Sequence, residues 1–164
     1  MIMVLDRKNS PLKQPLISEA KSLLRPTFEK FCKAVEEQKW DEAVAFYDEE
    51  AALVETGKKG VHGREAIKQE FLKFSEVAGK VTFKVAFLIV FRVFERIYTF
   101  LVVSTALFSQ VLSEHYEMTT DFITLNAEFE LTSEKKGVEK GKALQIWRKK
   151  GDSYQLYHEE FSVA

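Results

Sequence analysis

The sequence has little cysteine, proline or glycine, and it carries almost no net charge. Its single cysteine, Cys32, excludes an internal disulfide and fits a reducing compartment. The 164 residues contain no internal repeat, no low-complexity segment and no linker that would separate two domains. The formal net charge is −1, so no overall field attracts nucleic acid or anionic lipid, and we expect no nucleic-acid partner.

The sequence also lacks an uninterrupted apolar run long enough for a membrane span. Its most apolar stretch runs from Val85 to Leu112, where 20 of 28 residues are apolar. A span needs about 20 consecutive apolar residues. Arg92, Glu95 and Arg96 divide this stretch, and each charge costs roughly 2.5–3.5 kcal/mol at the bilayer centre. With an N-terminal apolar stretch too short for a signal peptide, the sequence predicts a cytoplasmic protein that does not cross a membrane.

The N-terminal half reads as three helices. An amphipathic helix is expected after Pro26, which either lies in a first helical turn or kinks a longer helix that starts near Ser18. Asp41 can cap a short second helix. A third helix is expected over residues 64–74, ended by Gly79. Residues of one face of the first helix recur at helical spacing: Phe28, Phe31, Cys32 and Val35.

The C-terminal half reads as strands. Alternating apolar and polar residues predict strands near residues 51–56, 80–86 and 119–134, and two strands over 141–163 joined by a turn at 149–152. The stretches 57–63 and 134–142 are expected as a turn and a solvated loop. Helices followed by antiparallel strands indicate an α+β fold with a curved sheet packed on three helices. We expect residues 1–17 to form a flexible tail and residues 18–164 one domain.

The order of these motifs resembles the nuclear transport factor 2-like superfamily. That superfamily includes ketosteroid isomerase, scytalone dehydratase, polyketide cyclases and the association domain of calcium/calmodulin-dependent kinase II. The sequence looks closest to the 4440 family of domains of unknown function. The resemblance implies a cone formed by a strongly bent mixed sheet around a deep pocket, often dimeric through the outer face of the sheet. The residues that carry it are Asp41, Ala43 (one place early), Tyr47, Glu49–Glu50–Ala51, and Val61-His62-Gly63-Arg64-Glu65-Ala66-Ile67.

The apolar stretch departs from this pattern. In the family, the strand "GKVTFKV" would lead almost directly into "SEHYEMTTDF" as a neighbouring strand, yet about 26 residues stand between them. This insert, at about residues 86–112, has no Lys, Asp, Gly or Pro. Three interpretations stay open: a translated intron or gene-model error, a genuine element that covers the sheet, or a partner-binding segment.

The resemblance to ketosteroid isomerase suggests a general base, and Glu55 matches its position. Glu55 shares a strand face with Leu53, which would direct it into the cone, where an apolar pocket raises a carboxyl pKa. The other half of the isomerase site is missing. Phe31 stands where the oxyanion-hole tyrosine would be, and the late-strand acid corresponds to Gln145 or Leu144. The sequence therefore favours a chain without isomerase activity.

Further residues are candidates for ligand contacts. His158 and Glu160 lie two apart on the last predicted strand and would share a face with Tyr154. The alternative for this pair is a polar outer face or a dimer contact. The histidines lack metal-ligand spacing, so we expect no metal and no cofactor. The complete set of predicted ligand-binding residues is Phe31, Tyr47, Leu53, Tyr116, Gln145, His158 and Glu160.

Three functional hypotheses follow. The first is a pocket that binds a small hydrophobic ligand. The second is a non-catalytic module for homodimerisation or interaction. The third is an enzyme of the isomerase, dehydratase or cyclase type with Glu55 as the general base. A polar group buried in a deep apolar pocket would favour the first hypothesis, and a filled cone with a broad apolar sheet face would favour the second.

Overall fold

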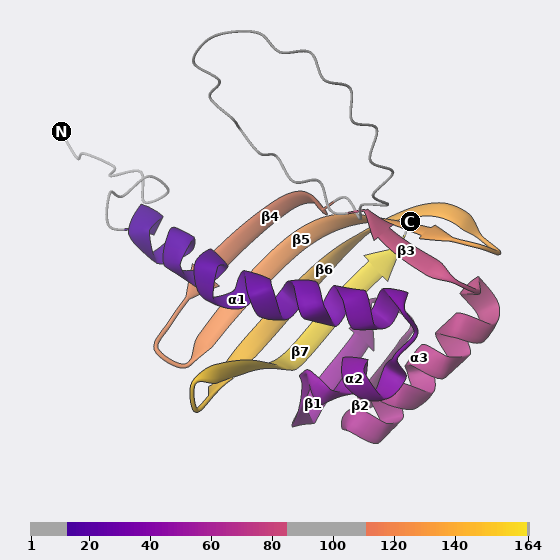
Figure 1. The fold of residues 1–164 in the computed structure, drawn as a ribbon, viewed down its shortest axis with the longest axis horizontal. Coiled ribbons are helices and arrows are strands. Elements are labelled where there is room, and N and C mark those ends of the chain that lie inside the picture. The colour runs from indigo at the N-terminus through magenta and orange to yellow at the C-terminus, as the bar shows by residue number, and fades with distance from the viewer. Residues whose placement is uncertain (1–12, 85–110, 164) are drawn as a thin grey trace, which may run out of the picture.

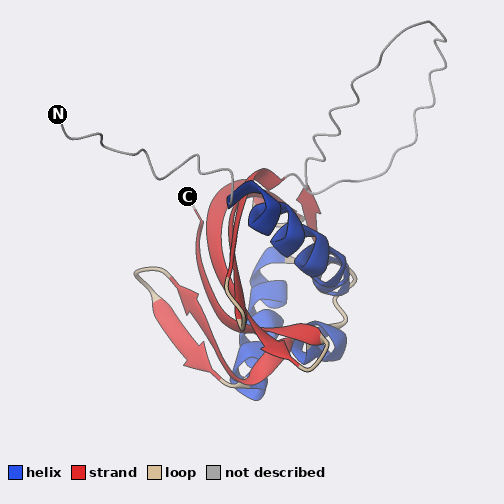
Figure 2. Cartoon of the chain, turned by 90° about the vertical axis from the view of Figure 1, so that its left-hand side faces the viewer, coloured by secondary structure: helices blue, strands red, loops and turns tan. Residues whose placement is uncertain are grey.

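A single bent sheet with three helices forms the described part of the chain, and this confirms the predicted α+β class. The computed structural model describes residues 13–84 and 111–163. Figure 1 shows α1 lying across one face of the sheet, and Figure 2 shows how strongly the sheet bends around that side. The elements are α1 (Lys13–Glu36), α2 (Trp40–Ala45), β1 (Tyr47–Glu55), β2 (Lys59–His62), α3 (Arg64–Ala78), β3 (Val81–Lys84), β4 (Val111–Met118), β5 (Phe122–Ser133), β6 (Gly137–Lys150) and β7 (Ser153–Val163).

The sheet is mixed and unclosed. Its strand order is β2-β1-β7-β6-β5-β3, and β4 also pairs with β5. β1 and β7 run parallel, whereas the other pairs are antiparallel. The parallel pair brings the first and last strands side by side, so residues more than 100 positions apart in sequence become neighbours in the sheet.

Helix α1 begins earlier than the sequence predicts. It starts at Lys13, so it includes the last residues of the segment 1–17 that we expected to be a tail. Pro15 is tolerated there because the first helical turn has no partner for its N–H groups. Pro26 lies inside the same helix, which decides between the two predicted placements. The helix persists because its apolar face, including Leu24, Phe28 and Phe31, is buried.

Two stretches expected as irregular structure belong to hairpins. Residues 59–62 form β2, which pairs with residues 52–55 of β1, so the turn is confined to about residues 56–58. Likewise β6 begins at Gly137, so only residues 134–136 connect it to β5. Both strands were missed because the stretches 57–63 and 134–142 are polar and rich in glycine, which is typical of turns and loops. Cross-strand pairing, such as that of Val61 with Leu53, stabilises strands whose own propensity is weak.

β3 and β4 lie end to end along one edge of β5. Lys84 is opposite Glu130, and Val111 is opposite the next residue of β5, Phe129. The sequence predicted neighbouring strands, and this detail was wrong, because the two strands continue one another instead of pairing side by side. Of the predicted insert, residues 86–110 lie outside the described residues, and residues 111–112 belong to β4.

The core lies between the inner face of the sheet and the helices. The ring of Phe31 makes edge contacts with Phe46, Tyr47 and Trp147, with ring centroids 5.7–6.3 Å apart. Tyr47 and Trp147 are fully buried. This aromatic cluster fixes α1 against β1 and β6, and so positions the inner face on which the polar residues lie.

Candidate functional site

Four polar or amphipathic side chains form a hydrogen-bonded chain on the inner face of the sheet. The Tyr47 hydroxyl donates to Glu159, and Gln145 Nε2 donates to Glu159 Oε1 at 2.8 Å. Trp147 Nε1 donates to Gln145 Oε1 at 3.0 Å. We call these four residues, Tyr47, Gln145, Trp147 and Glu159, the inner cluster. Two of its three donors, the Tyr47 hydroxyl and Gln145 Nε2, point toward the carboxyl group of Glu159.

Strand register brings the inner cluster together. Gln145 of β6 lies directly opposite Glu159 of β7, and Leu53 of β1 lies opposite Glu159 on its other side. Residues that face one another across strands project to the same side of a sheet. Tyr47 belongs to the same group because it is the first residue of β1, opposite Leu156.

Burial determines the electrostatics of the inner cluster. Tyr47, Gln145 and Trp147 are buried, while Glu159 is only half-buried. Burial raises the pKa of Glu159 above its ordinary value, although the hydrogen bonds from Tyr47 and Gln145 and the charge of His158 oppose the rise. Burial and the neighbouring Glu159 carboxylate raise the pKa of Tyr47 well above its usual range. Tyr47 therefore stays protonated and acts as a donor.

This arrangement places one acidic group among largely apolar surroundings. Glu159 is half-buried, whereas its three partners in the inner cluster are buried. Two donors fix the orientation of its carboxyl group, which when ionised has further acceptor positions. A carboxyl group with a raised pKa can bind a hydroxyl or carbonyl, or exchange a proton.

Five of the predicted ligand-binding residues lie on the inner face or the helix that covers it. Phe31, Tyr47, Leu53, Tyr116 and Gln145 are all buried. Tyr47 and Gln145 belong to the inner cluster, and Phe31 packs on it. Tyr116 lies apart, in β4, where its hydroxyl donates to Glu114 Oε2 at 3.3 Å and Lys21 of α1 pairs with the same oxygen at 2.8 Å.

The other two predicted residues, His158 and Glu160, project from the opposite face of β7. They alternate with Glu159, which projects inward, and Glu160 Oε1 accepts a hydrogen bond from Thr56 Oγ1 at 3.2 Å. The expectation that Tyr154 shares their face was wrong. The cause is a bulge in β7. Leu156 lies opposite Trp147 but His158 lies opposite Ile146, so Tyr157 is unpaired and the side chains on either side of it alternate in opposite phase.

Glu55 occupies the end of β1. It shares a strand face with Leu53 and lies opposite Phe161 of β7, but its carboxylate pairs with Lys58 Nζ at 2.6 Å in the adjoining turn. It does not contact the inner cluster. Sequence reasoning assigned the acid position to Glu55 and missed Glu159. The alternative for His158 and Glu160, a polar outer face, would have placed Glu159, the residue between them, on the inner face.

The outer face of the sheet is mixed in character. A concave region of about 430 Å³ draws its lining from both faces of the sheet, with His115, Asn126, Leu144 and Glu160 of the outer face and Glu114, Ala127, Ala143 and Phe161 of the inner face. A second region of about 470 Å³ lies between α1 and α2. Neither touches the inner cluster. In the described part of the chain the large, exposed apolar side chains are scattered over three elements, so they form no broad apolar sheet face: Leu23, Val77 and Val138.

Two further properties concern residues 13–84 and 111–163 alone. No helix there is both long and apolar enough to span a membrane. Within the same ranges no three side chains from His, Cys, Asp and Glu come together in a group that could hold a metal ion.

Comparison with solved structures identifies the architecture. A protein of unknown function from Pseudomonas putida matches with a TM-score of 0.63 at 15% identity, over 90% of this chain and 88% of its own. A candidate dehydratase of the nuclear transport factor 2-like family from Streptomyces avermitilis matches with a TM-score of 0.65 at 11% identity, over 90% and 97%. This chain has the nuclear transport factor 2-like fold. The resemblance expected from the sequence is thus confirmed at the level of the fold.

Other proteins with the nuclear transport factor 2-like fold differ in what they do. A ketosteroid isomerase-like protein from Erwinia carotovora atroseptica matches with a TM-score of 0.57 at 15% identity, over 88% of this chain and 96% of its own. No protein-family model and no curated protein sequence matches the chain. Because one fold carries many activities, the function has to be argued from the inner cluster.

Proposed function

We propose that the chain binds a small, largely apolar molecule that carries one polar group, and that Glu159 is the polar anchor. The observation that supports this proposal is the inner cluster itself. Tyr47 and Gln145 orient the carboxyl group of Glu159, and burial raises its pKa. Pockets for small molecules are typically apolar with few well-placed polar groups, and this is the composition around Glu159.

The rows next to Glu159 also suit an apolar ligand. The adjacent inward-facing row across the sheet runs from Phe161 through Ala143 and Ala127 to Glu114. Two consecutive alanines mean that the sheet places no long side chain between Phe161 and Glu114. A flat ring system bound over these alanines would bring its polar substituent to Glu159.

Paired probes test the proposal. 2-Naphthol offers an apolar bicyclic ring with one hydroxyl, and naphthalene offers the same ring without it. We expect saturable binding of 2-naphthol, followed by its fluorescence, and weaker binding of naphthalene. Glu159→Gln should weaken 2-naphthol binding by roughly 10-fold, as expected when a hydrogen bond to a charged group is lost, and leave naphthalene unchanged.

A matched control comes from the next residue of β7. Glu160 carries the same side chain on the opposite face, so Glu160→Gln should leave the binding of both probes unchanged. Equal binding of the two probes, or an equal loss of both in Glu159→Gln, would remove Glu159 as the anchor. The absence of saturable 2-naphthol binding to the full chain would contradict the proposal as a whole.

Acid–base catalysis of the isomerase or dehydratase type is a second candidate, and the raised pKa of Glu159 favours it. In this version Glu159 takes the role of base that the sequence assigned to Glu55. Exchange of the α-protons of 2-tetralone with deuterated solvent, followed by proton NMR, measures such a base directly. Exchange that is lost in Glu159→Gln but kept in Glu55→Gln would establish it, and a rate equal to that of buffer would eliminate it.

A further inference from the structure

β1 leaves its regular pairing with β7 directly after Tyr47. Tyr47 lies opposite Leu156, and the next paired residue of β1 is Ala52, opposite His158. Residues 48–51 therefore bulge between two paired positions. The ladder of hydrogen bonds that normally fixes side-chain direction along a strand is interrupted at the residue that donates to Glu159. The Leu156 N–H still donates to the Phe46 carbonyl oxygen at 2.8 Å, just before Tyr47, and side chains from outside the ladder hold the main chain after it.

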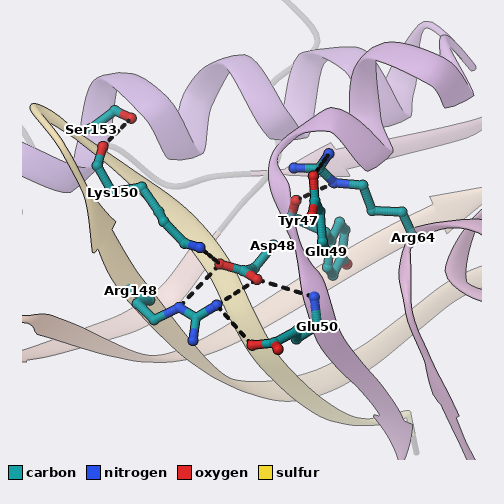
Figure 3. A network of polar contacts seen from close by, with 8 residues as sticks. All are labelled: Tyr47, Asp48, Glu49, Glu50, Arg64, Arg148, Lys150 and Ser153. Carbon is teal, nitrogen blue, oxygen red and sulfur yellow. Dashed lines mark hydrogen bonds and ion pairs between the residues drawn. The ribbon is translucent and has the colours of Figure 1, made fainter.

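Arg64 holds Tyr47 from the side of α3. It is the first residue of that helix, and its Nε donates to the main-chain carbonyl oxygen of Tyr47 at 2.6 Å. Its Nη1 lies 3.9 Å from Glu49 Oε1. Figure 3 shows Arg64 reaching β1 from one side of the bulge, while Arg148 and Lys150 approach from the other.

Asp48 holds the bulge from the side of β6. Arg148 Nη2 lies 2.6 Å from Asp48 Oδ1, and Lys150 Nζ lies 3.2 Å from Oδ2. The main-chain N–H of Glu50 donates to Asp48 Oδ1 at 3.1 Å, which closes the bulge on itself. The Asp48 side chain is 1% exposed. Burial raises its pKa, but hydrogen bonds from Arg148, Glu50 and Lys150 outweigh burial and lower the pKa to about 2.

We infer that Arg64 and the Asp48–Arg148 ion pair are positioning groups for the proposed ligand site: they hold the main chain around Tyr47 so that its hydroxyl stays hydrogen-bonded to Glu159. Both groups act through Tyr47, since neither belongs to the inner cluster. The inference rests on the proposed function for its relevance to ligand binding. Its structural content concerns only the bond between Tyr47 and Glu159.

The protonation of Glu159 reports on that bond. Beside burial, the groups that shift the pKa of Glu159 are Tyr47 of β1, Gln145 of β6 and His158 of β7, and Glu159 in turn raises the pKa of Cys32 in α1. The bond from Tyr47 lowers the pKa of Glu159, so Tyr47→Phe should raise it. A carbon-13 NMR titration of the glutamate carboxyl groups, with the Glu159 signal assigned by its loss in Glu159→Gln, measures this change in the full chain.

The variant Asp48→Asn distinguishes a role of Asp48 in positioning Tyr47 from a direct effect of the Asp48 charge on Glu159. Removing a negative charge would lower the pKa of Glu159 through space. Loss of positioning would raise the pKa of Glu159, because the hydrogen bond from Tyr47 is weakened. This rise should not exceed the rise in Tyr47→Phe. We expect the rise. A fall or an unchanged value would overturn the inference for Asp48.

Arg64→Gln gives a second measurement, which also decides the matter if Asp48→Asn does not fold. Arg64→Gln should raise the pKa of Glu159 in the wild-type background but not in Tyr47→Phe. The hydroxyl that Arg64 is proposed to position is absent from Tyr47→Phe. A rise that persists in the double variant is a through-space charge effect and contradicts the inference.

Binding of 2-naphthol tests whether these positioning groups matter for the proposed ligand site. Asp48→Asn and Arg64→Gln should each weaken its binding by about 3- to 10-fold, in line with one weakened hydrogen bond. If the wild-type chain does not bind 2-naphthol, the proposed function fails, while the titration still decides whether these groups position Tyr47. Unchanged 2-naphthol affinity in variants whose titration has moved would overturn the link to the ligand site.

Discussion

Lys84 and Val111 occupy consecutive positions along the edge of the sheet, although 26 residues separate them in the chain. Lys84 lies opposite Glu130 of β5, and Val111 lies opposite Phe129. The two strands β3 and β4 therefore occupy the track of one continuous strand along β5. This relationship bears directly on the insert that the sequence places at about residues 86–112.

Deleting residues 86–112 should preserve the fold. Val85 would be joined to Ser113, which lies opposite Glu128, so Val85 would take the place of Val111 opposite Phe129. The chain would then pass from β3 to β4 without a long connection to close, and long connections have a small entropic cost of about 0.6 kcal/mol for each doubling of length. We expect a melting temperature, measured by circular dichroism, at least equal to that of the full chain.

A deletion of one more residue is the matched control. Removing residues 85–112 would join Lys84 to Ser113 and shift β4 by one position, which turns its inward side chains outward. This variant should fold poorly. If the 86–112 deletion also fails to fold, the segment is an authentic part of the core. Sequencing the native transcript is independent of folding, since the intron interpretation predicts a message without these codons.

Gly141→Ala should destabilise the sheet by about 1–3 kcal/mol, because an added Cβ overpacks a close approach. That Cβ would lie 2.4 Å from Phe129 Cζ and 2.5 Å from the main-chain oxygen of Ser162. Gly60→Ala is the control, since its Cβ would meet Val54 at 3.5 Å, an ordinary contact. Urea unfolding measures both. Equal stability of the two variants would show that β6 and its neighbours can move apart at no cost.

Asp48→Asn should be less stable than the wild type by about 1.5–3 kcal/mol at neutral pH, the range for hydrogen bonds to charged groups. The pKa of Asp48 is lowered to about 2 in the folded chain, from 3.8. A lowered pKa contributes stability above the unfolded value, and this contribution is lost as the pH falls from about 4 toward 2. The difference between wild type and variant should shrink over that interval.

Glu159→Gln should show the opposite dependence on pH. Burial raises the pKa of Glu159 in the folded chain above 4.5, so the folded state binds the proton more tightly than the unfolded state. The contribution of Glu159 is therefore greatest at low pH and falls as the pH rises from about 4.5 through the folded pKa. The stability of the variant relative to wild type should increase over this interval in urea unfolding. A flat difference would mean that Glu159 is as well solvated as an ordinary surface glutamate.

The sequence determined the fold class because its signals are local. Helical spacing of Phe28, Phe31 and Val35, the end of α3 at Gly79 and the turn before Ser153 all depend on residues close together in the chain, and each was predicted. Alternation placed Leu53 and Glu55 on one strand face correctly, because β1 is regular over those residues.

Only the tertiary structure decided which acid belongs to the inner cluster. Glu159 meets Gln145 through antiparallel register and Tyr47 through the parallel pairing of the first strand with the last. The bulge at Tyr157 reverses the alternation of side chains along β7. Simple alternation therefore predicts that Tyr154 and His158 share a face, although they lie on opposite faces. Such contacts depend on register between strands distant in sequence, and the energies that fix register come from packing across the whole sheet, not from the local residues that a sequence displays.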